Sequence, residues 1–240
     1  MYQMSTVKKT ETNWLDVDWQ DELKNNITSV GALEDYIPLD KKEKAELLKV
    51  AEQHPMNIPR YYLELINPND PGDPIRKLSV PSSDELILAG AMGETTGDPY
   101  GDDKHDKGNG ILHKYPYTAL VVATEYCSMY CRHCFRKRMV GLPNDQTVKS
   151  FQQAAEYIAE HKEIKNVVMS GGDPLLLPTS ALRSMLDALR PIDHLNYVRI
   201  GSRAPVVFPM RFFDDELLLS LIHISEPTRR ACRSRIPSYA

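Results

Sequence analysis

The chain lacks the features that mark several large protein classes. It has four cysteines in 240 residues, and three of them lie in one short segment, so a disulfide framework is excluded. No apolar run approaches the length of a membrane span, and the polar start has no signal-peptide core. The net charge is -4, and before the last dozen residues no Lys/Arg run is extensive enough to indicate a nucleic-acid surface. We therefore expect no membrane or nucleic-acid partner and a reducing, cytoplasmic location.

The first part of the chain, residues 1–110, is expected to be helical and loop-rich. A helix should begin at Asp40, because Asp40 and Glu43 form a capping-box-like start to an amphipathic segment. Residues 67–81 are rich in Pro, Asp and Asn, which is typical of turns. Residues 93–110 are rich in Gly and Asp, and a solvated linker is the favoured interpretation over a cation site.

The second part, residues 111–218, alternates buried strands with amphipathic helices. Apolar runs predict strands, and 3.6-residue periodicity predicts helices between them. The expected strands and helices, in chain order, cover residues 117–124, 147–162, 166–169, 179–190 and 197–200. Alternation with a loop after each strand indicates an α/β fold with a parallel sheet. The pattern is typical of a parallel α/β barrel or an open sheet, and because only three βα units are visible, we do not expect a closed eight-fold barrel.

Three cysteines, Cys127, Cys131 and Cys134, follow the first predicted strand in the spacing Cys-x3-Cys-x2-Cys. This supplies three thiolates, one fewer than a closed tetrahedral metal site requires. On a [4Fe-4S] cluster they would leave one iron without a protein ligand, able to chelate a small molecule. A zinc knuckle with a distant fourth ligand is the alternative. His133 sits beside the third cysteine, and we interpret it as a packing residue and not as a ligand.

The motifs together resemble lysine 2,3-aminomutase and its relatives, a family of radical S-adenosylmethionine (SAM) enzymes. The resemblance runs from about Trp14 to about Leu218. It rests on the cysteine loop and, in the same order as in the family, on residues 36–39, 61–63, 69–77, 170–173 and 199–203. It implies a partial barrel with an N-terminal helical region. The implied cofactors are a [4Fe-4S] cluster, SAM and pyridoxal 5'-phosphate (PLP).

The resemblance also implies roles for particular residues. The cysteines would hold the cluster. SAM contacts are implied for residues at the ends of the second and third predicted strands: Ser170, Gly171, Gly172, Asp173, Ser202 and Arg203. Lys114 and Tyr115 match an Arg-Tyr pair that contacts the PLP phosphate, and Thr118 replaces a further arginine of that site. Arg136 matches the arginine that pairs with the substrate carboxylate.

The implied activity is amino-group migration in a small amino acid by means of a 5'-deoxyadenosyl radical. Lysine is the default substrate, and glutamate or arginine relatives share the visible motifs. A flavodoxin or ferredoxin would supply the electron, and a homo-oligomer is left open. Two alternatives remain. One is an aminomutase acting on a lysine of a translation elongation factor, and the other is a non-catalytic Fe-S or zinc-binding fragment.

The last residues, 219–240, are expected not to belong to the natural protein. Residues 219–229 look like a translated adapter sequence used in DNA library preparation, and the basic remainder lacks apolar periodicity. We assign His223 and Cys232 no role. The resemblance implies that the PLP lysine and the acidic substrate-binding residues are missing, so catalytic residues stay unknown. We expect this polypeptide alone not to turn over.

Overall fold

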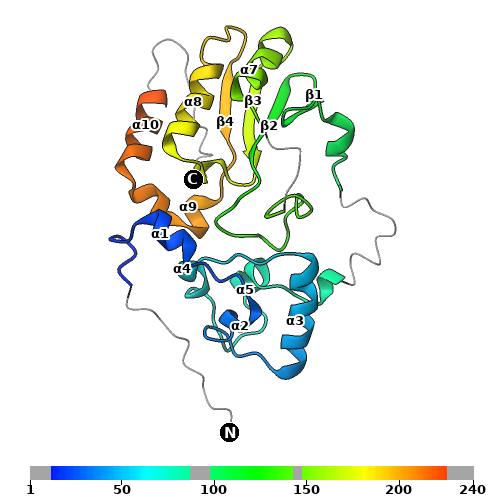
Figure 1. The fold of residues 1–240 in the computed structure, drawn as a ribbon, viewed down its shortest axis with the longest axis vertical. Helices are drawn as coiled ribbons and strands as arrows, with labels where there is room; N and C mark the ends of the chain where they lie inside the picture. Colours follow the sequence, from blue (N-terminus) through cyan, green and yellow to red (C-terminus); the bar gives the residue numbers. More distant parts are fainter. Residues whose placement is uncertain (1–11, 87–97, 143–147, 226–240) are drawn as a thin grey trace, which may run out of the picture.

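The computed structural model describes residues 12–86, 98–142 and 148–225, without the side chains of residues 222–225. A helical N-terminal region occupies one half of the molecule, and a sheet with its covering helices occupies the other (Figure 1). The loop that carries the cysteines lies at the junction of the two halves. None of the helices in these ranges has the length and apolar character needed to span a membrane.

Five helices lie in the described part of the N-terminal region, and α2 to α5 contribute to a core of its own. The helices are α1 (Trp19–Lys24), α2 (Val30–Leu33), α3 (Lys41–Gln53), α4 (Arg60–Leu63) and α5 (Pro74–Ser79). The predicted cap at Asp40 is confirmed, because its side chain accepts a hydrogen bond from the Glu43 amide. The core includes the fully buried side chains Leu33, Ile37, Ile58 and Leu63.

Helix α5 corrects the expectation of turns throughout residues 67–81. Asp73 caps this helix by accepting from the Arg76 amide, and Pro74 occupies the first turn, where a missing N–H costs nothing. The same Asp-Pro pair that indicates a turn therefore also starts a helix here. The competing signals cannot be separated by composition alone.

The predicted α/β class and parallel sheet are confirmed. The sheet contains β1 (Ile111–Tyr115), β2 (Thr118–Thr124), β3 (Asn166–Gly171) and β4 (Tyr197–Ile200), in that spatial order. Strands β2, β3 and β4 run parallel, as expected for βα units. Strand β1 was not predicted, and it pairs antiparallel with β2 across a tight connection.

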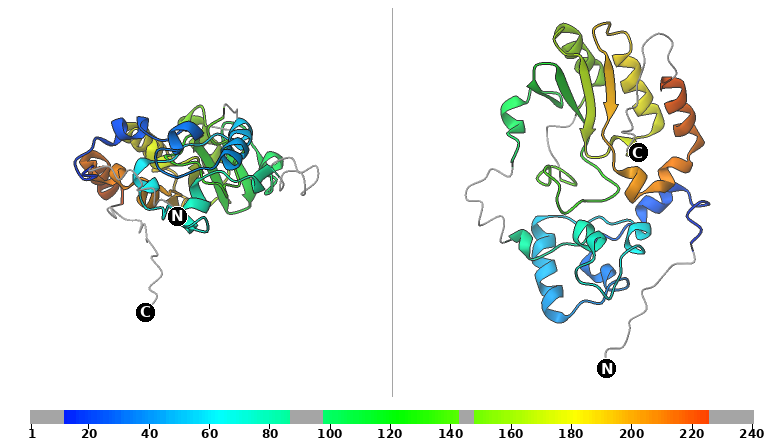
Figure 2. Two further views of the ribbon diagram at one scale, coloured as in Figure 1. Left: turned by 90° about the horizontal axis from the view of Figure 1, so that it is seen from below. Right: turned by 180° about the vertical axis from the view of Figure 1, so that it is seen from behind.

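The two faces of the sheet have different surroundings. Helices α7 (Phe151–Glu160), α8 (Thr179–Leu189) and α10 (Asp215–Ser225) cover one face (Figures 1 and 2). Alternate strand residues point into this layer, among them Ala119, Val121, Val167 and Met169, which are buried there. The opposite face carries Leu120 and Val168, which are only partly buried. This second face is the one left accessible to small molecules.

Short elements follow the carboxyl ends of the strands. The 3-10 helix η2 (Pro174–Leu176) follows β3, and α9 (Ala204–Val207) with η3 (Pro209–Phe213) follows β4. A further 3-10 helix, η1 (Asp102–His105), precedes β1. Loops after parallel strands share one edge of a sheet. This edge faces the N-terminal region (Figure 1).

Helix α10 crosses the boundary at which a non-native tail was expected. Leu217 and Ser220 are both buried, and the Ser220 hydroxyl accepts a hydrogen bond of 2.7 Å from Arg183 on α8. The fold thus uses residues on both sides of position 218. The origin of residues 219–240 stays a prediction, and residues 226–240 lie outside the described part.

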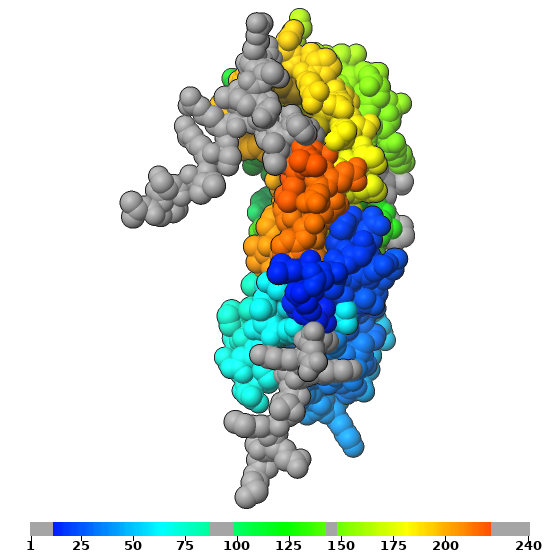
Figure 3. Space-filling model, turned by 90° about the vertical axis from the view of Figure 1, so that its left-hand side faces the viewer, coloured from blue at the N-terminus to red at the C-terminus, as the bar shows by residue number. Residues whose placement is uncertain are grey.

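Arg211 joins the two ends of the described chain. Residues 12–24 pack beside η3 and α10 (Figure 3), where the Trp19 indole donates to Asp214 at 3.2 Å. The Arg211 side chain is fully buried, lies 4.2 Å from the Trp19 ring and pairs with Asp214. It also donates to the carbonyls of Leu175 and Leu177 after β3. A buried cation with this many partners fixes the segments around it.

Replacing Arg211 by methionine should lower the free energy of unfolding by about 3 kcal/mol, because two carbonyls and the Asp214 carboxylate lose their donor. Urea denaturation measures this change. Arg190→Met is the matched control, since Arg190 is exposed and pairs only with Asp187 in an i,i+3 contact. Equal destabilisation by the two substitutions would contradict the role given to Arg211.

Candidate functional site

The three predicted thiols follow β2 in one loop. Cys127, Cys131 and Cys134 are free cysteines of intermediate burial. A backbone bond of 3.1 Å from the Cys134 amide to the Cys131 carbonyl closes a turn between the last two. Burial raises the pKa of the Cys127 thiol well above its usual range, and the negative charges of Asp173 and the neighbouring thiols add to this effect. Burial also raises the pKa of Cys134. A cation arriving here would therefore displace protons.

The thiols do not converge on one point. Within the described ranges, no three His, Cys, Asp or Glu side chains are arranged to hold a single metal ion. A structural zinc site needs its ligands around one centre at about 2.0–2.3 Å. Thiolates of an iron-sulfur cluster bind different irons and need not meet.

The N-terminal region holds the start of the cysteine loop. The Asn57 side chain donates to the Cys127 carbonyl at 3.0 Å, and its own backbone carbonyl accepts from the Tyr130 amide at 2.9 Å. The buried Asn26 amide donates to the Ser128 carbonyl at 2.7 Å. These side chains satisfy loop carbonyls that no strand pairs. The loop is thus held by residues that lie about 70 to 100 positions earlier in the chain.

Arg132, between the second and third cysteines, forms a second anchor. Its guanidinium makes two bonds to the Glu85 carboxylate, at 2.9 and 2.6 Å, and a third to the Pro55 carbonyl at 3.1 Å. Lys137 also pairs with Glu85. Burial opposes ionisation of Glu85, but the hydrogen bonds from Arg132 and Lys137 lower its pKa. The sequence analysis missed this anchor, since Glu85 is 47 residues from Arg132.

The Ser170–Asp173 segment packs directly against the cysteine loop. The Gly172 amide donates to the Thr124 carbonyl at 2.6 Å, and the Asp173 amide donates to the Tyr126 carbonyl at 2.8 Å. Gly171 has φ +103°, which favours glycine. A Cβ on Gly172 would lie less than 3.0 Å from the Tyr126 carbonyl oxygen. Both glycines are needed for this close approach of two backbones.

Asp173 ties the loop after β3 to the loop after β4. Its side chain is 4% exposed. One carboxylate oxygen accepts from the Leu175 amide at 3.1 Å, and the other accepts from the Arg203 and Ala204 amides at 2.8 and 2.9 Å. With its oxygens engaged on amides, Asp173 shapes the backbone around the site.

The other residues expected to contact SAM lie at this same edge. Ser170 lies one residue before the end of β3 and pairs with Val122. The Ser202 hydroxyl accepts from the Ala204 amide at 3.1 Å. Arg203 follows β4, and its guanidinium reaches back to the Cys131 sulfur at 2.8 Å. The structure therefore brings the three sequence-predicted groups, the thiols and the two strand-end loops, to one place.

Lys114, Tyr115 and Arg136 meet at a second place, on the accessible face of the sheet. They line a cavity of about 280 Å³ together with Thr118. Leu120 and Val168 form part of its apolar wall. Lys114 is exposed and donates to the Tyr100 carbonyl at 2.7 Å. A cavity with an apolar wall and two cationic side chains can bind an anionic, partly apolar ligand.

Asp102 is an exception to the interpretation of residues 93–110 as a solvated linker. Its side chain is 8% exposed and pairs with Arg136, whose Nε donates to a carboxylate oxygen at 3.1 Å. Both side chains line the cavity. The linker composition hid this contact, because an Asp-rich loop looks the same whether its acids face solvent or a distant arginine.

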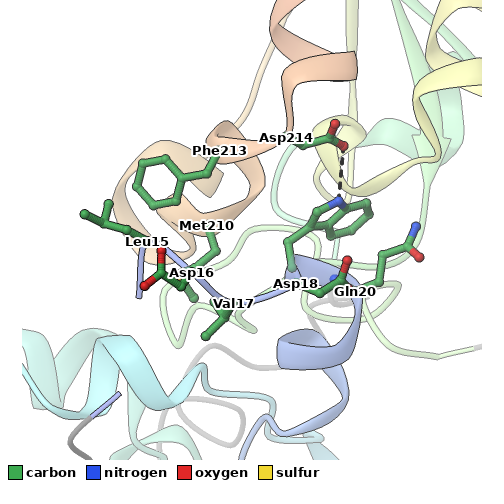
Figure 4. A pocket seen from close by; sticks show the side chains of 9 residues that line it. Leu15, Asp16, Val17, Asp18, Gln20, Met210, Phe213 and Asp214 are labelled. Atoms are coloured by element: carbon green, nitrogen blue, oxygen red, sulfur yellow. Dashed lines mark hydrogen bonds between the residues drawn. The ribbon is translucent and has the colours of Figure 1, made fainter. Parts of the chain in front are cut away.

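His133 lies within the cysteine loop, and a further cavity lies elsewhere in the molecule. His133 is exposed, and partial burial with nearby Arg203 and Lys137 lowers its pKa. A larger cavity of about 470 Å³ lies where residues 15–20 meet η3 (Figure 4). None of the predicted site residues lines it. Its walls include the Trp19–Asp214 contact described above, so we assign it to packing of the chain's first described segment.

Substituting Gly172 by alanine should destabilise the fold by about 2–3 kcal/mol, because the new methyl group would push the Tyr126 backbone away. Urea denaturation checks this value. Gly31→Ala is the matched control: Gly31 lies in helix α2, and nothing lies within 4 Å of its added Cβ. The control should be neutral or stabilising. If Gly172→Ala behaved like the control, the close backbone approach would be wrong.

Comparison with known proteins identifies relatives of this chain. The family model described as "Radical SAM superfamily" matches residues 121–240. The chain is 41% identical over 203 residues to L-lysine 2,3-aminomutase of Clostridium subterminale, covering 84% of this chain and 48% of the relative. The enzyme of the same name from Methanococcus maripaludis is 43% identical over 210 residues, covering 86% and 47%.

A third relative is glutamate 2,3-aminomutase of Clostridioides difficile, 38% identical over 213 residues, covering 88% of this chain and 49% of the relative. The chain spans about half the length of these curated relatives. The resemblance inferred from the motifs is confirmed. On the match across half of its residues, the chain belongs to the radical SAM superfamily.

Proposed function

We propose that the protein is a radical SAM amino-acid 2,3-aminomutase that also uses PLP. The observation that carries the proposal is the cysteine loop held between the N-terminal region and the two strand-end loops. Similarity to lysine and glutamate 2,3-aminomutases supports the reaction class. Because the chain spans about half of those relatives, the activity is proposed for the whole protein.

Cys127, Cys131 and Cys134 would hold the [4Fe-4S] cluster that the superfamily implies. Three free thiols on one anchored loop fit this donor set, and they leave one iron for a small molecule. When bound, the reduced cluster and SAM supply one-electron radical chemistry. The chain's contribution is to hold the three thiols in place and to surround them with buried groups. A low-potential electron donor such as flavodoxin or ferredoxin would be its partner.

The strand-end loops would bind SAM. Gly171 and Gly172 let the backbone after β3 pack against the end of β2 and the start of the cysteine loop, which brings it beside the thiols, and Asp173 keeps that backbone fixed through its bonds to three amides. Polar groups from Ser170 and Ser202 lie at the same edge. In this proposal backbone atoms would contact SAM, and the Asp173 carboxylate would hold that backbone in position.

The second cavity would hold PLP and the substrate. Lys114 and Tyr115 would contact the phosphate. The lysine ammonium would act as a single positive charge, without the two parallel hydrogen bonds that an arginine guanidinium can donate. Arg136 would pair with the carboxylate of the amino acid, a geometry suited to a guanidinium. Asp102 already holds one edge of Arg136 through Nε, which orients the remaining donors. A carboxylate is common to lysine and glutamate, so Arg136 does not choose between them.

Cluster assembly can be tested on the 240-residue chain. After anaerobic reconstitution with ferrous iron and sulfide, about four irons per chain should bind, and dithionite plus SAM should release 5'-deoxyadenosine and methionine. Cys134→Ala should lose at least tenfold of this cleavage, because one iron loses its ligand. Cys232→Ala, at a cysteine with no assigned role, is the control and should match wild type. Metal uptake without SAM cleavage would favour the non-catalytic alternative.

Phosphate binding can be tested separately with 4-deoxypyridoxine 5'-phosphate, which keeps the ring and phosphate of PLP but has no aldehyde to react with surface lysines. Lys114→Met should weaken its binding about three- to tenfold, the loss of about one charged contact. Lys162→Met is the control, since Lys162 is exposed and does not line the cavity. Fluorescence titration gives both dissociation constants. Equal dissociation constants for Lys114→Met and Lys162→Met would contradict a contact between Lys114 and the phosphate.

A further inference from the structure

The side chain of Arg203 has an unusual partner for a guanidinium. Its Nη1 donates to the sulfur of Cys131 at 2.8 Å, and its Nη2 approaches the Tyr62 hydroxyl at 3.4 Å. Among the described residues, no carboxylate forms an ion pair with it. Its charge is thus directed at a thiol and not at an acid.

The surroundings fix this side chain in place. The Arg203 amide is bound by Asp173, and the adjacent Ala204 is fully buried. Tyr62 is 3% exposed and belongs to a cluster of buried residues that Cys131 also contacts. The donor therefore comes from the end of β4, is supported by the N-terminal region, and ends on the cysteine loop. Three separate parts of the chain meet in one N–H···S contact.

We propose that Arg203 is a positioning and tuning residue that donates a hydrogen bond to the Cys131 ligand and raises the reduction potential of the cluster. The inference rests on the proposed function, because it requires the cluster to be present. An electron entering the cluster adds one negative charge, spread over its irons and sulfurs. A cationic donor at a ligand sulfur stabilises that reduced form more than the oxidised form. No covalent bond is formed or broken in this step.

The consequence for the reaction is a balance between two requirements. A higher potential makes the cluster easier to reduce by a low-potential donor. The same shift weakens the reduced cluster as a reductant toward a sulfonium. Arg203 would set this balance from outside the metal's own ligands, in the way that hydrogen bonds to sulfur do in other iron-sulfur sites.

The test measures the midpoint potential of the reconstituted 240-residue chain by anaerobic titration with dithionite, followed by EPR of the reduced cluster. Arg203→Met keeps the length of the side chain and removes both the charge and the donors. It should make reduction about tenfold less favourable, which is a shift of about 59 mV toward more negative potential for a one-electron couple. Arg203→Lys retains the charge and should shift less.

Two further variants separate a specific contact from a general effect. Tyr62→Phe removes only the hydroxyl beside Nη2 and should give a smaller shift in the same direction. If Arg203→Met fails to fold, Tyr62→Phe still tests the proposal. Arg199→Met removes one positive charge from an exposed position on the same strand and should leave the potential unchanged.

The outcomes are distinguishable. If the wild-type chain binds about four irons and Arg203→Met has the wild-type potential, the inference is overturned and the proposed function stands. An equal shift in Arg199→Met would also overturn it, because the effect would be general electrostatics. If the wild-type chain fails to assemble a cluster, the proposed function fails first and the inference falls with it.

Discussion

The anchoring of one short loop is the constraint on which the rest of the molecule depends. Residues 127–134 form no strand or helix, so their backbone groups need partners from elsewhere. The Asn57 side chain supplies one such partner from the N-terminal side, and the Arg132–Glu85 pair ties a side chain of the loop to the same region. On the other side, the Asp173 amide binds the backbone at Tyr126. A loop held from both sides can keep three thiols in place before any metal arrives.

Because the strands are parallel, a few strands are enough to bring the loops of the site together. Strands β2, β3 and β4 deliver their following loops to one edge, and the closest approach there is backbone against backbone. Glycine at 172 permits that approach, since any side chain would meet the Tyr126 carbonyl. Arg136, two residues after the last thiol, then turns toward the accessible face of the sheet. The two parts of the site are thus neighbours in sequence as well as in space.

The sequence predicted what depends on local pattern. The strands at 117–124, 166–169 and 197–200 have apolar runs, and the thiol spacing is visible directly. Strand β1 was missed because Ile111–Tyr115 has only two buried residues and gains its pairing from β2. Helix α5 was missed because Asp73-Pro74 serves turns and helix starts alike. Both elements were missed because the local sequence is compatible with more than one kind of secondary structure.

Contacts between distant residues were beyond any local pattern. Nothing near Glu85 indicates that it will meet Arg132, and nothing near Asp102 indicates that it will meet Arg136. Arg203 was expected at the site because of the family resemblance, but its sulfur partner follows from the fold alone. Charged side chains pair according to where the backbone carries them. A single sequence therefore gives the candidates and leaves the pairing open.

The position of the anchors in the chain has a consequence for biosynthesis. Asn26, Asn57 and Glu85 all leave the ribosome before the first cysteine does, and the helices around them possess a hydrophobic core of their own. Nascent chains acquire structure from the N-terminus onward. The side chains that hold the cysteine loop are therefore already synthesised when the thiols emerge.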